Sequence, residues 1–265
     1  MGDLPDLSAT TFLVIEGAFS LAFATFAGAA IFFLACRRDV ALAYRASVTV
    51  CAVVVAIAAY HYFRLFESFA SAYESDGELA TVTGTVFNEA YRYMDWLITV
   101  PLLVVELILV MGLLGGKRRS LLFKLVPASF LMIVLGYPGE LSNDAGSQWL
   151  WWGLAMIPFV YILFVLFTEV SKVIASQPEE VQPLFQMVRI ALLVSWLFYP
   201  IAYLFPILLG NTGTALALEN VGYAVADLTA KVGYGLIIFL IAKKKSEVER
   251  AELDTSVGIA QPVAH

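Results

Sequence analysis

Charged residues are scarce in this chain. Only 14% of its 265 residues are Asp, Glu, Lys or Arg, whereas 60% are hydrophobic, and the mean hydropathy is +0.82. A soluble domain of this size does not need so much apolar surface, so the composition excludes an ordinary soluble protein and indicates a membrane protein. The net charge of −6 further argues against nucleic-acid partners.

Other features of secreted or repeat proteins are missing as well. The two cysteines, Cys36 and Cys51, show no recognisable pairing pattern, and we interpret them as apolar filler away from any functional centre. Residues 1–6 lack the basic region of a signal peptide, so we expect the first apolar stretch to be retained as a helix. Because large repeats and long connections are also missing, residues 1–265 are predicted to form a single domain.

Seven apolar stretches are each long enough to cross the hydrocarbon core of a bilayer, which takes about 20 helical residues. We therefore predict an all-α membrane protein built as a bundle of seven transmembrane helices. The expected helices lie at 9–35, 43–69, 87–113, 120–140, 146–171, 183–209 and 216–242.

The basic residues predict how the bundle is oriented. Thirteen of the sixteen Lys and Arg residues flank the first, third and fifth connections or follow the seventh helix. Because cytoplasmic loops are enriched in Lys and Arg, we expect the N-terminus outside and the C-terminus in the cytoplasm. In the outer connection 71–86, the β-branched run 79–86 around Gly84 suggests a small β-hairpin. An irregular polar loop is the alternative.

Lys231 is the most informative residue of the chain. It lies within the last apolar stretch, where an ammonium group costs about 3 kcal/mol and needs a partner or a chemical purpose. Asp227 precedes it by four residues and therefore shares its helix face, and a second buried carboxylate, Asp95, lies in the third stretch. One lysine that faces two acids suggests a covalently modified centre that changes charge inside the membrane.

Further polar side chains of the third stretch line up with Asp95. Glu106 follows it by eleven residues, which at about 100° each end about 20° from three full turns, so both carboxyls share a face roughly 16 Å apart along the axis. Arg92 precedes Asp95 by one turn and points to the same side. Thr99 lies between the two acids and is expected to bond either Asp95 or the backbone one turn back.

These charges predict a proton path. Opposite charges favour an ionised carboxylate, whereas burial favours the neutral acid. We expect Asp95, clustered with Asp227 and Arg92, to be ionised, and Glu106, which has no nearby cation in the sequence, to be protonated. In the orientation given above, these states define an outward path. The alternative is that the charges only pair with one another and hold the helices together.

The same residues resemble the third, sixth and seventh helices of microbial rhodopsins. The matching motifs are Arg92-Tyr-Met-Asp95-Trp96…Thr99…Leu103…Glu106, Trp196-Leu-Phe-Tyr199-Pro200 and Asp227-Leu-Thr-Ala-Lys231. The resemblance covers nearly the whole chain. It implies that all-trans retinal is joined to Lys231 as a Schiff base, in a pocket that includes Trp96, Leu103, Met132, Trp196 and Tyr199.

The resemblance also implies roles for the polar residues. Asp95 would be the proton acceptor, Asp227 the second counterion and Glu106 the cytoplasmic proton donor, as in outward pumps of the proteorhodopsin and xanthorhodopsin groups. His61 matches a histidine beside the acceptor and would tune Asp95 through a shared hydrogen bond; a satisfied core histidine is the alternative. The paired outer glutamates of archaeal pumps have no clear match, which leaves Glu140 or Glu219 as candidates for proton release.

Two segments, 60–68 and 149–158, look most like the xanthorhodopsin branch. In that branch a glycine on the fifth helix opens a lateral window beside the retinal ring, where a carotenoid antenna can bind in the membrane. Gly153 is the candidate for this gap. The alternative is a glycine that lets two helices approach closely.

We therefore predict a light-driven outward proton pump of a bacterial inner membrane, which is not an enzyme in the usual sense. The resemblance implies retinal as cofactor, protons as the transported ion, lipid contact and a ring-shaped homo-oligomer, often a pentamer. A sensory rhodopsin is the alternative, but such proteins usually lack a carboxylic donor at the position of Glu106. Chloride pumps lack the Asp95 carboxylate, and a transporter or receptor without retinal would be colourless.

Overall fold

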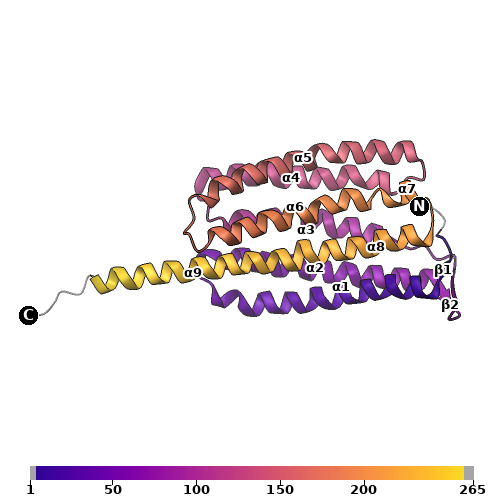
Figure 1. The fold of residues 1–265 in the computed structure, drawn as a ribbon, viewed down its shortest axis with the longest axis horizontal. Helices are drawn as coiled ribbons and strands as arrows, with labels where there is room; N and C mark the ends of the chain where they lie inside the picture. Colours follow the sequence, from indigo (N-terminus) through magenta and orange to yellow (C-terminus); the bar gives the residue numbers. More distant parts are fainter. Residues whose placement is uncertain (1–3, 260–265) are drawn as a thin grey trace, which may run out of the picture.

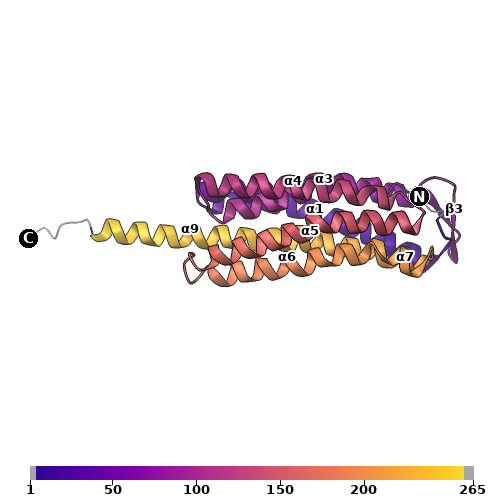
Figure 2. The same ribbon diagram turned by 90° about the horizontal axis from the view of Figure 1, so that it is seen from above.

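The computed structural model describes residues 4–259, and its long helices form a bundle of seven membrane spans (Figure 1). The prediction of an all-α seven-helix bundle is confirmed. Turned by 90°, the bundle shows helices that run side by side along its full length (Figure 2). The first five spans contain α1 (Ala9–Cys36), α2 (Arg45–Ala72), α3 (Ala90–Val110), α4 (Gly115–Glu140) and α5 (Ala145–Ile174).

The last two spans are each interrupted. The sixth consists of α6 (Gln182–Ala202) and α7 (Phe205–Leu209), and Pro206, which cannot donate a backbone hydrogen bond, follows the break. The seventh consists of α8 (Gly213–Asp227), a π-helical segment η3 (Leu228–Gly233) and α9 (Tyr234–Ile259). Two short 3₁₀ turns, η1 (Arg37–Asp39) and η2 (Leu42–Tyr44), connect α1 to α2.

Helix ends follow capping chemistry that the apolar pattern does not encode. Ser8, Asp144 and Thr212 accept backbone N–H groups at the starts of α1, α5 and α8, with oxygen–nitrogen distances of 3.1, 2.7 and 3.1 Å. Helix α3 ends at Val110 rather than near 113, because Gly112 turns the backbone into the left-handed region with φ +75°.

Helix α9 continues to Ile259 and projects beyond the bundle (Figure 1), whereas the apolar pattern ends near 242. The extension is rich in Lys and Glu, which are good helix formers in water. An ion pair three residues apart, Lys244 to Glu247 at 3.6 Å, lies on its surface. A helix can therefore leave the membrane without breaking, and hydropathy does not mark its end.

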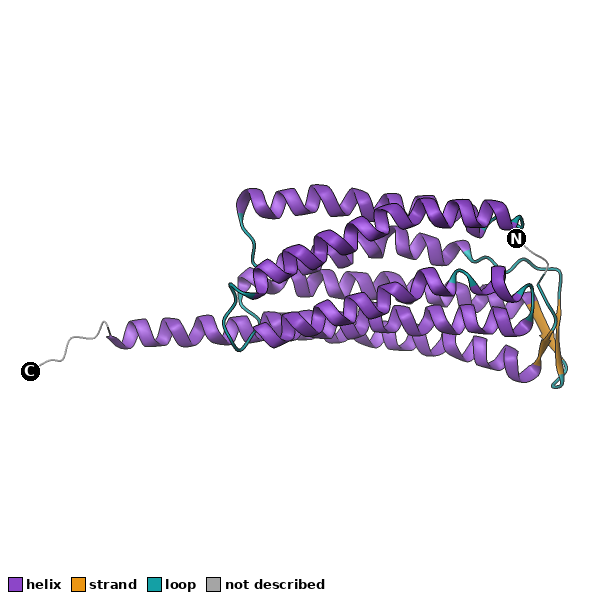
Figure 3. Cartoon of the chain, turned by 45° about the horizontal axis from the view of Figure 1, so that its top comes forward, coloured by secondary structure: helices purple, strands orange, loops and turns teal. Residues whose placement is uncertain are grey.

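The strands lie together at the end of the bundle opposite to the C-terminus (Figure 3). Strands β2 (Tyr73–Ser75) and β3 (Leu79–Val82) form the predicted hairpin, and β1 (Leu7–Ser8) adds to β3 in the order β1-β3-β2. The turn lies at Gly77, with φ +99°, and not at Gly84. Asp76 fixes this turn by accepting the N–H groups of Leu79 and Glu78 at 2.9 Å each, and these bonds hold the pKa of Asp76 below its usual range.

Candidate functional site

Lys231 lies in the π-helical segment η3 and is 1% exposed. Its Nζ is 2.5 Å from Asp95 Oδ2 and 2.9 Å from Asp227 Oδ1. Segments of π-helix are rare and often occur at functional sites. The structure therefore brings Asp95 of α3 next to Lys231 and Asp227, which lie four residues apart in the seventh span.

Asp227 is the most heavily bonded carboxylate of the site. Besides Lys231, it accepts hydrogen bonds from the hydroxyls of Tyr199 at 2.5 Å and Tyr62 at 2.8 Å, and from the indole N–H of Trp96 at 3.1 Å. These donors come from α6, α2 and α3. Such bonds stabilise the ionised carboxylate in a buried position. The sequence analysis missed Tyr62, although it adjoins His61 in the predicted second helix.

Asp95 has fewer partners than Asp227. Its Oδ1 has no hydrogen-bond partner among the residues that the structure describes. His61 Nδ1 is 4.0 Å away from this oxygen, beyond hydrogen-bond range, and lies 3.0 Å from the Ile57 carbonyl. The Thr99 hydroxyl donates to the backbone carbonyl of Asp95 at 2.9 Å, which is the second of its two expected roles.

Arg92 does not join the counterion cluster in the way that we expected from the sequence. Its guanidinium bonds Asn220 at 2.5 Å and Glu89 at 3.3 Å and covers the Tyr223 ring at 4.7 Å. Within residues 4–259 no ion pair joins it to Asp95 or Asp227. The reason is that helical side chains lean toward the N-terminus of their helix, which for Arg92 is the end that carries the strands.

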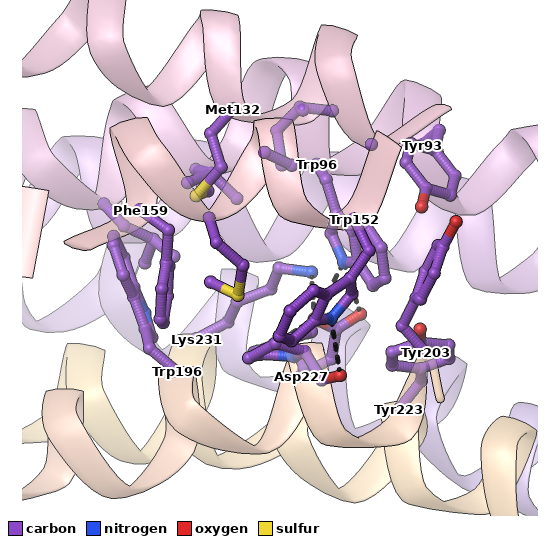
Figure 4. A pocket seen from close by; sticks show the side chains of 18 residues that line it. Tyr93, Trp96, Met132, Trp152, Phe159, Trp196, Tyr203, Tyr223, Asp227 and Lys231 are labelled. Carbon is purple, nitrogen blue, oxygen red and sulfur yellow. Dashed lines mark hydrogen bonds and ion pairs between the residues drawn. The ribbon is translucent and has the colours of Figure 1, made fainter. Parts of the chain in front are cut away.

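The Lys231 side chain enters a cavity between the helices (Figure 4). Trp96, Leu103, Met132, Trp196 and Tyr199, all expected from the sequence, line this cavity. Phe159 and Trp196 lie on one side of the lysine in Figure 4, and Tyr93, Tyr203 and Tyr223 lie on the other. Further lining residues that the sequence analysis did not name include Val100, Ile133, Trp152, Ala155 and Met156.

Gly153 is the one expected pocket residue that is not among those lining the cavity. A side chain added at Gly153 would meet no atom within 4 Å, so this face of α5 is open. The preceding residue, Trp152, lines the cavity and donates its indole N–H to the Pro200 carbonyl at 3.0 Å. The Trp152 indole therefore forms part of the wall between α5 and α6.

Glu106 is completely buried, and neither of its carboxyl oxygens has a hydrogen-bond partner among the described residues. The Cys51 side chain, from α2, faces this carboxyl, while its thiol lies 4.0 Å from the Gly235 carbonyl. Cys51 belongs to the apolar core, as its interpretation as apolar filler predicts, and within that core it lies beside Glu106. Among the residues that the structure describes, Glu106 therefore takes no part in a hydrogen bond that joins two helices.

A second cavity opens at the end that carries the strands. Glu89, Glu140 and Glu219 contribute to its lining, which places both candidates for proton release at one opening. Glu140 accepts from the Tyr93 hydroxyl at 3.3 Å, and Tyr93 also lines the Lys231 cavity. Tyr203 lines both cavities, so the two cavities adjoin at this tyrosine.

Comparison with known proteins identifies the class of this fold and site. The chain belongs to the bacteriorhodopsin-like protein family, which it matches over residues 14–245. The resemblance to microbial rhodopsins is thereby confirmed. Family membership implies a retinal chromophore and supports light-driven proton transport within the membrane.

Individual relatives place the chain more closely. A crystal structure of xanthorhodopsin, described as a light-driven ion pump with dual chromophore, superimposes with a TM-score of 0.89 at 47% identity, covering 93% of this chain and 99% of that one. Green-light absorbing proteorhodopsin from Gamma-proteobacterium EBAC31A08 is 31% identical, over 91% of this chain and 90% of the relative. Archaerhodopsin-2 from Halobacterium sp. (strain aus-2) is 33% identical over 66% of each chain.

The residues present fit retinal. The cavity is lined mainly by apolar and aromatic side chains, as pockets for rigid apolar ligands are, and it holds a buried amine that can form a covalent bond. Asp95 and Asp227 supply the negative charge that a positive nitrogen on Lys231 needs in an apolar environment.

Proposed function

We propose that this protein is an outward proton pump driven by light, which retinal bound to Lys231 absorbs. The observation that carries the proposal is the asymmetry around Lys231. Two carboxylates lie within 2.9 Å of its nitrogen, and a buried, unpartnered carboxyl, Glu106, lies on the other side along α3. Retinal, joined to Lys231, would supply the group that absorbs light and a positive charge on the lysine nitrogen.

The residues then perform the proton transfers. Asp95, which has one oxygen 2.5 Å from Nζ and the other without a partner, is placed to accept the proton from this nitrogen. Asp227, held by Tyr62, Tyr199 and Trp96, is placed to remain ionised and balance the charge. Glu106, whose burial favours the neutral acid, is placed to return a proton to Nζ.

Direction follows from the arrangement of charge along the bundle. The basic connections and the C-terminus lie at the end nearer to Glu106, and the strands and the Glu-lined cavity lie at the end nearer to Asp95. With basic residues in the cytoplasm, protons leave through the outer cavity, where Glu140 and Glu219 are available to pass them on. The host membrane proposed is a bacterial inner membrane, in which the protein assembles as a ring of five.

The test is to illuminate retinal-fed cells in unbuffered salt and follow the external pH. We expect acidification that a protonophore abolishes, together with a visible pigment. Lys231→Ala should abolish both the colour and the signal, while the exposed Lys244→Ala should change neither. Colourless wild-type protein, or alkalinisation in its place, would contradict the proposal.

We propose that His61 tunes Asp95 by moving into hydrogen-bond range of its carboxylate during the reaction. The resting separation of 4.0 Å requires only a small shift of the imidazole to form a hydrogen bond with Asp95 Oδ1, which has no partner. His61→Ala should therefore shift the pH at which the pigment changes colour. An unchanged titration of absorbance against pH would remove His61 from the mechanism.

We extend the proposal to a carotenoid antenna on the open face of α5 at Gly153. The free space beside Gly153 supports this position, as does the dual chromophore of xanthorhodopsin, to which the chain is similar. Because Trp152 forms the adjacent cavity wall, the carotenoid would lie against its indole. Gly153→Phe should abolish carotenoid-sensitised pumping in an action spectrum while retinal-driven pumping persists. Sensitisation that survives in this variant would place the antenna elsewhere.

A further inference from the structure

A lysine near the inner end of the seventh span has an unusual environment. Lys245 is only 8% exposed, and its ammonium donates to the carbonyls of Val110 and Met111, at 3.3 and 3.4 Å. These carbonyls end α3, where a positive charge is favourable. The ammonium also lies 4.9 Å from the centre of the Tyr44 ring, a distance typical of a cation–π contact.

The backbone around this ammonium leaves room for it. Gly112 adopts φ +75°, and a Cβ added there would lie 2.9 Å from Lys245 Nζ. Any other residue at 112 would strain the turn and crowd the ammonium. Lys245 is thus held by two backbone carbonyls and one aromatic ring.

Two neighbouring residues of α9 attach the same segment to the connection between α1 and α2. The Tyr44 hydroxyl donates to the Glu249 carboxylate, and Ser246 accepts the Ala41 N–H at 2.8 Å while it donates to the Ala242 carbonyl at 2.6 Å. We refer to Tyr44, Lys245, Ser246 and Glu249 as the inner clamp. It joins α9 to the end of α3 and to the start of α2.

Glu106 lies one helical turn before Val110, the first carbonyl that Lys245 holds. Val110 and Met111 are buried, as are Ile238 and Ile241 of α9. This layer and the inner clamp thus close the bundle between the cytoplasmic end and Glu106, whose carboxyl oxygens accept no hydrogen bond from the described residues. A proton that reaches Glu106 from that end has to pass this closed layer.

We propose that Lys245 is a positioning residue for proton uptake, which holds the inner end of the bundle shut until Glu106 has given up its proton. The inference rests on the proposed donor role of Glu106. When Lys245 releases the two carbonyls, the end of α3 can move away from α9, and water can then reach Glu106. Breaking the clamp should therefore make uptake easier while it loosens the end of α3.

The experiment compares Lys245→Met with the matched control Lys244→Met, which removes a lysine that is 41% exposed at its side chain. Two quantities are measured on full-length pigment: the rate at which the resting state recovers after a flash, and amide hydrogen exchange in residues 108–112. We expect Lys245→Met to recover several-fold faster and to lose protection at these amides. Lys244→Met should match the wild type in both.

A merely structural role predicts a different pattern. If Lys245→Met lowers the thermal midpoint but recovers at the wild-type rate, the inference is wrong, whereas the pumping proposal stands as long as the wild type acidifies the medium. If Lys245→Met does not fold, Tyr44→Phe opens the link to Glu249 and keeps the ring under Lys245. Faster recovery in Tyr44→Phe supports the inner clamp, and unchanged recovery overturns it.

Discussion

Two regions of α3 hold buried carboxyls in opposite environments. Around Asp95, the neighbouring Lys231 and the four partners of Asp227 create a polar centre with both signs of charge. Around Glu106, about three turns further along, the described residues offer no hydrogen bond to either oxygen. The difference shows that one helix can hold one acid in surroundings that favour its charged form and a second acid in surroundings that favour its neutral form. The partners from other helices decide which state each acid prefers.

The largest expected effect comes from the polar region. Asp95→Asn removes the carboxylate 2.5 Å from Lys231 and leaves an amide that cannot accept a proton at neutral pH. We expect light-driven acidification to disappear and the absorption maximum to shift to longer wavelength. Glu74→Gln, at an exposed residue of β2, is the control that should pump normally. Acidification by the Asp95→Asn variant would show that the two regions are not specialised as described.

The next effect tests the apolar region. Glu106→Gln preserves shape and burial but removes the donor proton, so the recovery of the resting state should slow by about 10²-fold, the usual range for loss of a general acid. Recovery is followed by flash absorbance, with Glu252→Gln on the exposed part of α9 as control. A normal rate in Glu106→Gln would assign the donor role to another residue.

A smaller effect is expected from the bonds that hold Asp227. Tyr199→Phe deletes a donor 2.5 Å from Oδ1 and leaves this buried oxygen with less compensation, so we expect a loss of stability of about 1–3 kcal/mol. The thermal midpoint of the pigment measures it. Tyr161→Phe, at a residue of α5 that is 42% exposed, should leave the midpoint unchanged. Equal midpoints for both variants would mean that Asp227 does not depend on this tyrosine.

The smallest effect is expected from Thr99, which lies on the helix face between the two regions. Its hydroxyl already donates to the Asp95 backbone carbonyl, and such back-bonding contributes little, so Thr99→Val should change recovery by less than about twofold. Flash absorbance again measures the rate. A change as large as that of Glu106→Gln would mean that Thr99 bonds a carboxyl during the cycle.

Much of the site could be predicted from spacing within single helices. Asp227 and Lys231 are four apart, and Asp95 and Glu106 are eleven apart, so local periodicity was sufficient to place each pair on a common face. Contacts between helices were predicted less well, because they depend on how each helix is rotated. Tyr62 was missed as a partner of Asp227, Arg92 was expected beside Asp95, and Cys51 was taken as remote from the charged line.

Gly153 and the ends of the elements illustrate the same limit. A glycine in an apolar helix can face a cavity, a neighbouring helix or lipid, and the packing around it decides which. Here Trp152 lines the cavity, whereas Gly153 does not. The connection contains two glycines that suit a turn, Gly77 and Gly84, and the hairpin was expected around Gly84. The Asp76 bonds, which select Gly77, became apparent only in the folded chain.

The sequence by itself determined the membrane class, the seven spans, the family and the residues that bring charge into the bilayer. These properties depend on composition and on distances along one helix, which chain geometry fixes. The tertiary structure alone decided which acid is bonded and which has no hydrogen-bond partner among the described residues, where the cavities open, and that Lys245 binds the end of α3. Such properties arise from side chains far apart in the chain, whose contacts exist only once the helices have packed.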